Sequence, residues 1–113
     1  MHALIIEDEF LIAITIEDVL RDCGFTSFDI AASVEKAVAA ATRRCPDLIT
    51  ADVQLRPGSG IAAVETICGG PAIPVIFITG NVADAKERLP EHQVLNKPFS
   101  EALLIAAVAS ALA

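Results

Sequence analysis

The chain has 113 residues, of which 54% are hydrophobic and 4% aromatic, with neither Trp nor Tyr. Its 15 acidic residues outnumber the 8 Lys and Arg residues and give a formal net charge of −7. This length fits one domain, and the apolar content excludes an intrinsically disordered chain. The acidic charge argues against binding to nucleic acid or to an anionic membrane surface.

Acidic residues and helix breakers also argue against export and membrane insertion. Glu7, Asp8 and Glu9 interrupt the N-terminus where a signal peptide needs a basic start and then an apolar stretch. The longest uncharged run, 66–83, contains several glycines and prolines, which do not suit a membrane-spanning helix. The three cysteines form no Cys-x-x-Cys pair, so we expect reduced thiols in a cytoplasmic protein.

Apolar runs alternate with segments of helical spacing along the whole chain. The runs predict strands at 3–6, 28–31, 48–51, 75–78 and 93–95. The intervening segments predict helices at 10–23, 34–44, 60–68, 82–89 and 101–112, with Ser33 and Ser100 as N-caps. Three of the runs do not alternate polar and apolar residues, which is typical of parallel strands covered on both faces. The sequence therefore predicts an α/β fold with helices on both faces of a parallel sheet.

The fourth helix is the weakest of these elements. Only 82–89 is available before Pro90, so we expect this helix to be short or mobile. No linker or low-complexity stretch divides the chain, and 1–113 is expected to be a single domain with no output domain after the last helix.

Apolar spacing assigns a buried face to the first and the last helix. The expected core face of the first helix consists of Ile12, Ile16, Val19, Leu20 and Cys23. The expected core face of the last helix consists of Leu103, Leu104, Ala107, Val108 and Ala111. This leaves Ile105 and Leu112 on a flank beside the fourth helix, and Phe10 and Ile14 opposite the core face of the first helix. These four residues are candidate partner surfaces. His2 and His92 have no ligand spacing and receive no role.

Polar side chains follow four of the predicted strands. Glu7 and Asp8 come after the first strand, Asp52 after the third, Thr79 and Gly80 after the fourth, and Lys97 after the fifth. The carboxyl ends of parallel strands meet at one edge of a sheet, so we expect these side chains to lie together.

Clustered carboxylates need a cation, and oxygen ligands favour Mg²⁺ or Mn²⁺. A carboxylate beside the metal can attack phosphorus and form an acyl phosphate, whose oxygens Lys97 and Thr79 can neutralise. The set predicts phosphoryl transfer to Asp52.

The residues Glu7-Asp8, Asp52, Thr79 and Lys97-Pro98, in this order and spacing, resemble the receiver domain of bacterial two-component response regulators. The resemblance covers the whole chain. It implies a flavodoxin-like fold with the strand order 2-1-3-4-5.

The resemblance also implies a role for each residue of the set. Asp52 would be the phosphorylated residue. The metal ligands would be Asp8 directly, Glu7 through water, Asp52, and the backbone carbonyl of Gln54. Thr79 and Lys97 would bind the phosphoryl group, and Gly80 would leave room for it. The Lys97-Pro98 peptide would be cis. Gln54 and Asn81 stand where the family tunes hydrolysis of the acyl phosphate.

The sequence departs from the family pattern at several positions. Val94 stands where most receivers carry the Tyr or Phe that moves with the switch threonine, so the signal must leave by another route. Arg56 replaces the usual proline, with Pro57 one place later. The run 77–80, Phe-Ile-Thr-Gly, is similar to the Phe-Ala-Thr-Gly motif of a subgroup of single-domain receivers, some of which act in general stress signalling.

The sequence thus predicts a single-domain response regulator and not an enzyme acting on a separate substrate. It would take a phosphoryl group onto Asp52 from a histidine kinase or histidine phosphotransfer protein, which could dock at Phe10 and Ile14. It would then switch the face formed by helix four, strand five and helix five for a downstream partner or a second copy, and slowly dephosphorylate itself.

Two alternative functions stay open. A hydrolase with an aspartyl-phosphate intermediate would need a second Asp two residues after the nucleophile, where Gln54 stands. A non-phosphorylated scaffold with the receiver fold would not need the intact set of acids, Thr79 and Lys97.

Overall fold

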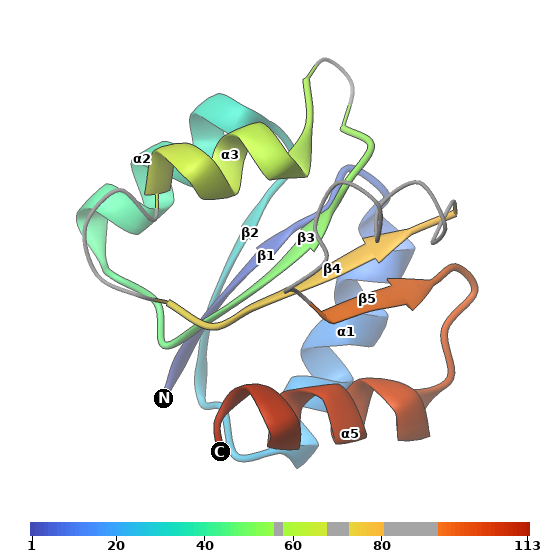
Figure 1. The fold of residues 1–113 in the computed structure, drawn as a ribbon. Helices are drawn as coiled ribbons and strands as arrows, with labels where there is room; N and C mark the ends of the chain where they lie inside the picture. Colours follow the sequence, from blue (N-terminus) through green and yellow to red (C-terminus); the bar gives the residue numbers. More distant parts are fainter. Residues whose placement is uncertain (56–57, 68–72, 81–92) are drawn as a thin grey trace.

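The computed structural model describes residues 1–55, 58–67, 73–80 and 93–113 (Figure 1). The strands are β1 (His2–Ile6), β2 (Ser27–Ala31), β3 (Leu48–Asp52), β4 (Val75–Thr79) and β5 (Gln93–Asn96). All neighbouring strands are parallel, in the order β2-β1-β3-β4-β5. The helices are α1 (Phe10–Asp22), α2 (Val34–Arg43), α3 (Gly60–Ile67) and α5 (Glu101–Ala111). The predicted fold is confirmed, while the helix expected at 82–89 lies outside the described residues.

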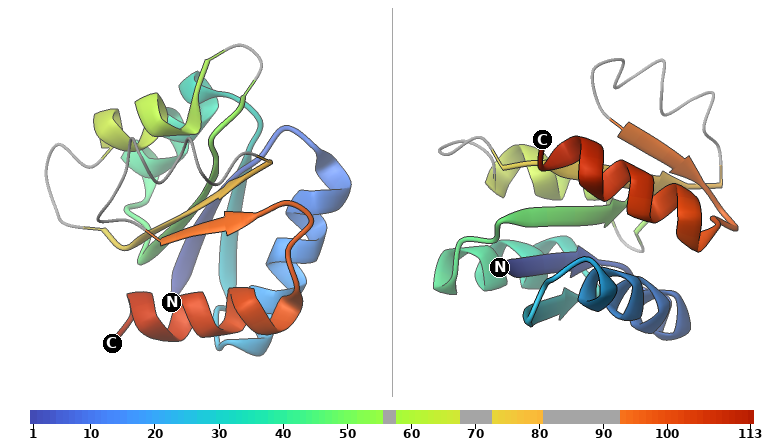
Figure 2. Two further views of the ribbon diagram at one scale, coloured as in Figure 1. Left: turned by 45° about the vertical axis from the view of Figure 1, so that its right-hand side comes forward. Right: turned by 90° about the horizontal axis from the view of Figure 1, so that it is seen from below.

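Helices cover both faces of the sheet. In Figure 1, α2 and α3 lie above the sheet and α1 and α5 lie below it, and the left view of Figure 2 shows the same layers. Every residue of β1, β3 and β4 is buried, so these three strands show no polar alternation in the sequence. Two apolar clusters result, one on each side of the sheet. None of the described helices is long and apolar enough to cross a membrane.

Side-chain caps set the starts of two helices where the sequence predicted them. The Ser33 Oγ accepts a hydrogen bond of 3.2 Å from the backbone N–H of Lys36 at the start of α2. The Ser100 Oγ accepts one of 3.1 Å from the N–H of Leu103 at the start of α5. Each cap satisfies one of the N–H groups that have no partner within the first helical turn.

The predicted core face of α5 is wrong at one residue. Leu103 is 59% exposed, whereas Leu104, Ala107 and Val108 are buried and Ala111 is half-buried. After its first residue α5 carries no charge, so the pattern of polar and apolar residues does not select one face. In α1 the predicted face is confirmed, with the addition of Ala13, which is fully buried.

The flank of α5 that carries Ile105 and Leu112 is exposed, as the sequence predicted, with exposed fractions of 44% and 38%. Glu101 lies one helical turn before Ile105 and shares a pocket with Ile12 and Thr15 of α1. The flank therefore lies on the α1 side of α5. The helix beside which the sequence placed this flank lies outside the described residues.

His2, which received no role from the sequence, is a buried structural residue. Its Nδ1 lies 2.8 Å from the Ser27 Oγ and its Nε2 lies 3.0 Å from the Asp29 Oδ2, both on β2. Its backbone N–H donates to the Asp47 Oδ2 at 2.7 Å, just before β3. His2 therefore links β1 to both neighbouring strands at the amino-terminal end of the sheet.

Candidate functional site

The carboxyl ends of four strands bring the predicted residues to one edge of the sheet. Asp52 is the last residue of β3 and Thr79 the last of β4, and both are buried. Glu7 directly follows β1 and is 2% exposed. Lys97 directly follows β5, and its backbone N–H donates to the Thr79 carbonyl oxygen at 2.8 Å. The Lys97–Pro98 peptide is cis, as the resemblance to receiver domains implied.

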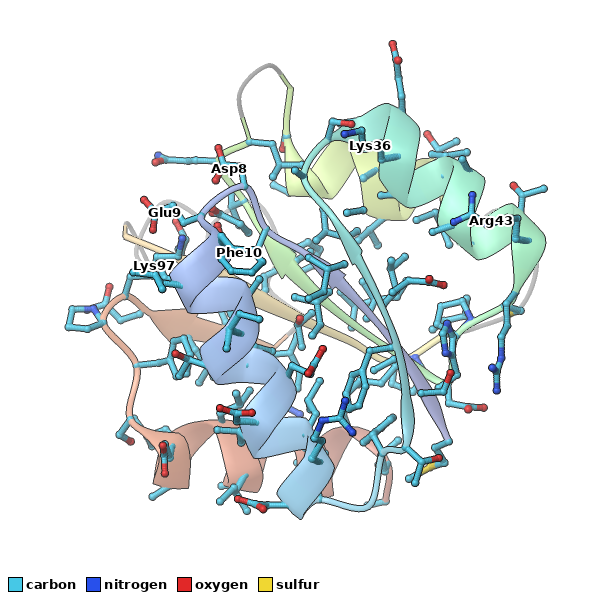
Figure 3. All side chains as sticks on the ribbon, turned by 180° about the vertical axis from the view of Figure 1, so that it is seen from behind. Asp8, Glu9, Phe10, Lys36, Arg43 and Lys97 are labelled. Carbon is cyan, nitrogen blue, oxygen red and sulfur yellow. The ribbon has the colours of Figure 1, made fainter. Side chains whose placement is uncertain are left out.

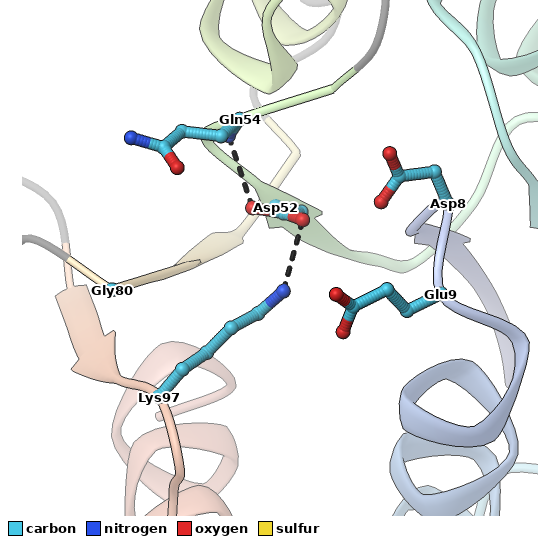
Figure 4. Close-up of a pocket in the computed structure, with 6 residues that line it drawn as sticks. All are labelled: Asp8, Glu9, Asp52, Gln54, Gly80 and Lys97. Atoms are coloured by element: carbon cyan, nitrogen blue, oxygen red, sulfur yellow. Dashed lines mark hydrogen bonds and ion pairs between the residues drawn. The ribbon is translucent and has the colours of Figure 1, made fainter.

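The Lys97 ammonium lies between two buried carboxylates. Its Nζ is 2.9 Å from the Asp52 Oδ2 and 2.9 Å from the Glu7 Oε1. Figure 4 shows the side chain reaching across the site to Asp52. The two carboxylates are almost fully removed from water, so the loss of this ammonium would leave them as uncompensated buried charges.

Three carboxylates form a cluster with the geometry of an oxygen-ligand site. Glu7, Asp8 and Asp52 each offer one oxygen, and these oxygens lie within 4.8 Å of one another. The backbone N–H of Gln54 donates to the Asp52 Oδ1 at 3.0 Å, which holds the carboxylate in place. Clustered carboxylate oxygens are the donors that hard divalent cations prefer, so the residues present fit a magnesium or manganese ion.

Burial sets the proton affinity of Glu7. Removal from water raises the pKa of the Glu7 carboxyl to about 7, although its bond to Lys97 opposes the shift. Burial alone would lower the pKa of Lys97, but its bonds to Asp52 and Glu7 outweigh burial and raise it. The Lys97 ammonium is therefore charged at neutral pH, whereas the Glu7 carboxyl is close to the midpoint of its titration.

The cluster opens into a cavity of about 330 Å³ (Figure 4). Its lining consists of Asp8, Glu9, Asp52, Gln54, Gly80 and Lys97. A Cβ atom at Gly80 would have no described atom within 4 Å, so the glycine adds open space at the mouth. Asn81, the other residue predicted to tune hydrolysis, lies outside the described residues.

Two residues of the site were not identified from the sequence. Gly60 was assigned only to a helix start, but a Cβ there would overlap the backbone carbonyl oxygen of Asp52, so only glycine fits. Glu9 was noted only as an acid that argues against a signal peptide, yet it lines the cavity. The sequence contained one indication that position 60 is special. Glycine is a poor helix former, yet it stands at the first position of a short predicted helix.

Val94 and Phe77 are neighbours on the two strands that carry Thr79 and Lys97 at their carboxyl ends. Val94 on β5 is opposite Phe77 on β4 in the parallel register and packs against the same apolar cluster. The aromatic side chain of this pair is therefore Phe77, which is 1% exposed, and the position with the missing aromatic holds a half-buried valine.

The acidic cluster and Lys97 at the carboxyl edge of a five-stranded parallel sheet are the features of a receiver domain. The family model for the response regulator receiver domain matches residues 3–109. The chain therefore belongs to the response regulator receiver domain family, whose members signal as phosphoacceptors in two-component systems.

Several known proteins are similar to this chain. The phyllosphere-induced regulator PhyR of Methylorubrum extorquens is 37% identical over 96% of this chain and 42% of its own length. The solution structure of the PhyR receiver domain from Erythrobacter litoralis is 38% identical, with a TM-score of 0.85, over 98% of this chain and 88% of that one. The crystal structure of the anti-anti-sigma factor PhyR from Bartonella quintana is 39% identical, with a TM-score of 0.84. The match covers 98% of this chain and 46% of that one. The chain thus spans less than half of the full-length PhyR proteins.

The raised pKa of Glu7 predicts a pH-dependent effect of Glu7→Gln on stability. The folded state binds the Glu7 proton more tightly than the unfolded state between about pH 4.5 and pH 7, so the metal-free wild type loses stability as pH rises through this window. Glutamine does not titrate. We expect the free energy of unfolding of Glu7→Gln relative to wild type to rise by about 2 kcal/mol from pH 4.5 to pH 8.

Urea denaturation of both proteins in the presence of EDTA measures this difference. The matched control is Glu35→Gln, which removes an exposed carboxylate from the first turn of α2. A difference for Glu7→Gln that stays constant with pH would contradict the assignment of the raised pKa to this residue.

Proposed function

We propose that Asp52 accepts a phosphoryl group and that the chain acts as a phosphorelay switch. The observation that carries the proposal is the position of Lys97, whose Nζ lies 2.9 Å from Asp52 in a cavity of about 330 Å³. A phosphoryl group on Asp52 would place anionic oxygens beside this ammonium. Such a fixed cation stabilises the charge of a transferring phosphoryl group without reorganisation.

In the transfer step, an Asp52 carboxylate oxygen attacks phosphorus and the O–P bond of an acyl phosphate forms. The bond from phosphorus to the donor breaks, and the leaving group departs with its electron pair. Lys97 balances charge on the phosphoryl oxygens, and the Thr79 hydroxyl at the end of β4 donates to one of them. The open space at Gly80 admits the group.

The carboxylate cluster would hold Mg²⁺ or Mn²⁺ beside Asp52. Asp8, Asp52 and the Gln54 carbonyl would be direct ligands, and Glu7 would bind through water. When bound, the cation would supply positive charge that offsets the phosphoryl oxygens and the carboxylates. The proximity of the three carboxylate oxygens supports this ligand set.

Hydrolysis of the acyl phosphate would end the signal. Gln54 is exposed and lines the cavity, so its amide can hold the attacking water near the phosphoryl group. Asn81 is assigned the same role from its position two residues after Thr79. The hydrolase alternative requires an acid at position 54, and the amide found there cannot protonate a leaving group.

Incubation with acetyl phosphate and Mg²⁺ tests the proposed function. We expect mass spectrometry of the intact protein to show one added phosphoryl group in wild type and none in Asp52→Ala. The matched control is Asp18→Ala, which removes an exposed aspartate of α1 and should leave the adduct unchanged. An adduct that persists in Asp52→Ala would contradict the proposal. Wild type with no adduct would favour the scaffold, and turnover of phosphate monoesters would favour the hydrolase.

We propose that the phosphodonor, a histidine kinase or histidine phosphotransfer protein, docks at the start of α1. Phe10 and Leu11 are 70% and 79% exposed, and Ile14 is half-buried beside them. Figure 3 shows Phe10 at the same corner of the molecule as Asp8 and Lys97. An apolar pocket of about 200 Å³ continues this surface, with Ile12, Thr15, Lys97, Pro98, Phe99 and Glu101 as its lining. An apolar surface at the rim of the site suits a protein that must deliver a group into it.

A second surface would bind the downstream partner or a second copy of the chain. It consists of Ile105 and Leu112, on the exposed flank of α5. In the proposed switch, phosphorylation changes the face that consists of β5, α5 and the segment expected to form helix four. Because Val94 stands on β5 where most receivers carry an aromatic residue, no aromatic side chain at that position takes part in this change.

Paired substitutions separate the two proposed surfaces. Phe10→Ser should slow phosphoryl transfer from the kinase about tenfold and leave the rate with acetyl phosphate unchanged, because only the protein donor needs the docking surface. Ile105→Glu should weaken self-association of the phosphorylated protein, measured by sedimentation, and leave both transfer rates unchanged. Each variant is the control for the other. Equal slowing with both donors in Phe10→Ser, or unchanged self-association in Ile105→Glu, would contradict the assignment of that surface.

A further inference from the structure

Glu9 occupies the N-cap position of α1, where a carboxylate ordinarily accepts a hydrogen bond from the first helical turn. The Glu9 side chain makes no such bond. Its carboxylate instead points into the cavity between Asp8 and Lys97 (Figure 4), and it is a lining residue of that cavity. The side chain is exposed, so it stands at the mouth rather than in the buried cluster.

The Glu9 carboxylate forms no ion pair with the described residues of the site and does not belong to its carboxylate cluster. The ion pairs of Lys97 among the described residues go to Glu7 and Asp52, and none of the ion pairs found there involves Glu9. Glu9 also contributes no oxygen to the cluster of Glu7, Asp8 and Asp52. An uncompensated carboxylate therefore faces the route by which a donor brings its phosphoryl group to Asp52.

We propose that Glu9 is a specificity-determining residue that selects phosphodonors by charge. The inference rests on the proposed phosphorylation of Asp52. A small donor must carry its anionic phosphoryl group past the Glu9 carboxylate, and the repulsion grows with the net charge of the donor. Glu9 thus disfavours doubly charged small donors relative to singly charged ones. Because the side chain is exposed, dissolved salt screens the effect.

Two small phosphodonors differ in the required way. At pH 7 acetyl phosphate is doubly negative, and its phosphoryl group transfers when the P–O bond breaks and acetate leaves with the electron pair. Phosphoramidate carries a protonated nitrogen and a single net negative charge, and its P–N bond breaks to release ammonia. Both reactions form the same O–P bond to Asp52, so the ratio of their rates reports the charge of the donor.

The experiment compares Glu9→Gln with wild type at one saturating Mg²⁺ concentration, so that any change in metal affinity cancels in the ratio. We expect the second-order rate constant with acetyl phosphate to rise about threefold, the one with phosphoramidate to rise less than about 1.5-fold, and the difference to disappear in about 0.5 M KCl. Glu35→Gln, which makes the same charge change far from the cavity, should leave the ratio unchanged.

The outcomes separate this inference from the proposed function. A ratio that is unchanged in Glu9→Gln, or changed equally in Glu35→Gln, would overturn the charge selection by Glu9 even if Asp52 is phosphorylated. A change in ratio that persists at high salt would overturn its electrostatic origin. Phosphorylation that continues in Asp52→Ala would instead overturn the proposed function.

Discussion

Gly60→Ala is expected to destabilise the protein by about 3 kcal/mol and to slow phosphorylation of Asp52 more than tenfold. The added Cβ would overlap the backbone carbonyl oxygen of Asp52, and no side-chain rotation can relieve a clash with the backbone. The backbone N–H of Gly60 also donates to the Val53 carbonyl at 3.2 Å, so movement of Gly60 would displace the end of β3. Urea denaturation and the rate of adduct formation measure the two effects.

The matched control for stability is Gly80→Ala. A Cβ at Gly80 would have no described atom within 4 Å, so the free energy of unfolding should change by less than about 1 kcal/mol. Equal stability of the Gly60 and Gly80 variants would contradict the close approach of Gly60 to β3.

Lys97→Met is expected to have the second large effect. The substitution keeps most of the side-chain volume but leaves the buried Asp52 and Glu7 carboxylates without their cation. Lys97 is 20% exposed, so we expect a loss of about 2 kcal/mol at pH 8, less than for a fully buried pair. The loss should shrink toward pH 5, because burial raises the pKa of the Glu7 carboxyl to about 7 and a protonated Glu7 leaves one buried charge fewer without its cation.

The same substitution should slow phosphorylation by acetyl phosphate more than tenfold, since Lys97 no longer balances charge on the transferring group. The control is Lys36→Met, which removes an exposed lysine of α2 that lies away from the site in Figure 3. Stability that falls equally at pH 5 and pH 8, or transfer at the wild-type rate, would contradict the role of Lys97.

The sequence predicts the fold and the site because both depend on local patterns. A buried parallel strand needs a continuous apolar run, and such runs mark β1, β3 and β4. The residue after each run must then lie at the carboxyl edge of the sheet. This rule places Glu7 and Asp52 at that edge, and it also places Lys97 there because Lys97 follows β5 of the same sheet. The three residues meet although each is 45 positions from the next.

Features that depend on contacts between distant elements were not predictable in this way. The partners of His2 lie 25 to 45 positions along the chain, so no local spacing reveals its hydrogen bonds. The exposure of Leu103 depends on how α5 is rotated against the sheet, which an uncharged helix does not encode in its pattern. The need for glycine at position 60 comes from a backbone approach that only the folded chain creates.

Part of the net charge of the chain is concentrated at the candidate site. Asp8, Glu9 and Asp52 line one cavity at the edge of the sheet, where only Lys97 among the lining residues is positive, and Glu7 is buried beside them in the carboxylate cluster. In the proposed function, metal binding, phosphoryl transfer and selection of the donor would all depend on the electrostatic field of this cluster. The predictions for Glu7, Glu9 and Lys97 test three contributions to that field.

Reduction of the phosphorylated protein with borohydride tests the central claim most directly. Borohydride converts an aspartyl phosphate to homoserine, so the site of the acyl phosphate can be read from a peptide by mass spectrometry. The proposed function predicts homoserine at position 52 in wild type treated with acetyl phosphate and Mg²⁺, and none without the donor. Reduction at Asp8 instead, or no reduction in protein that carries the added phosphoryl mass, would contradict it.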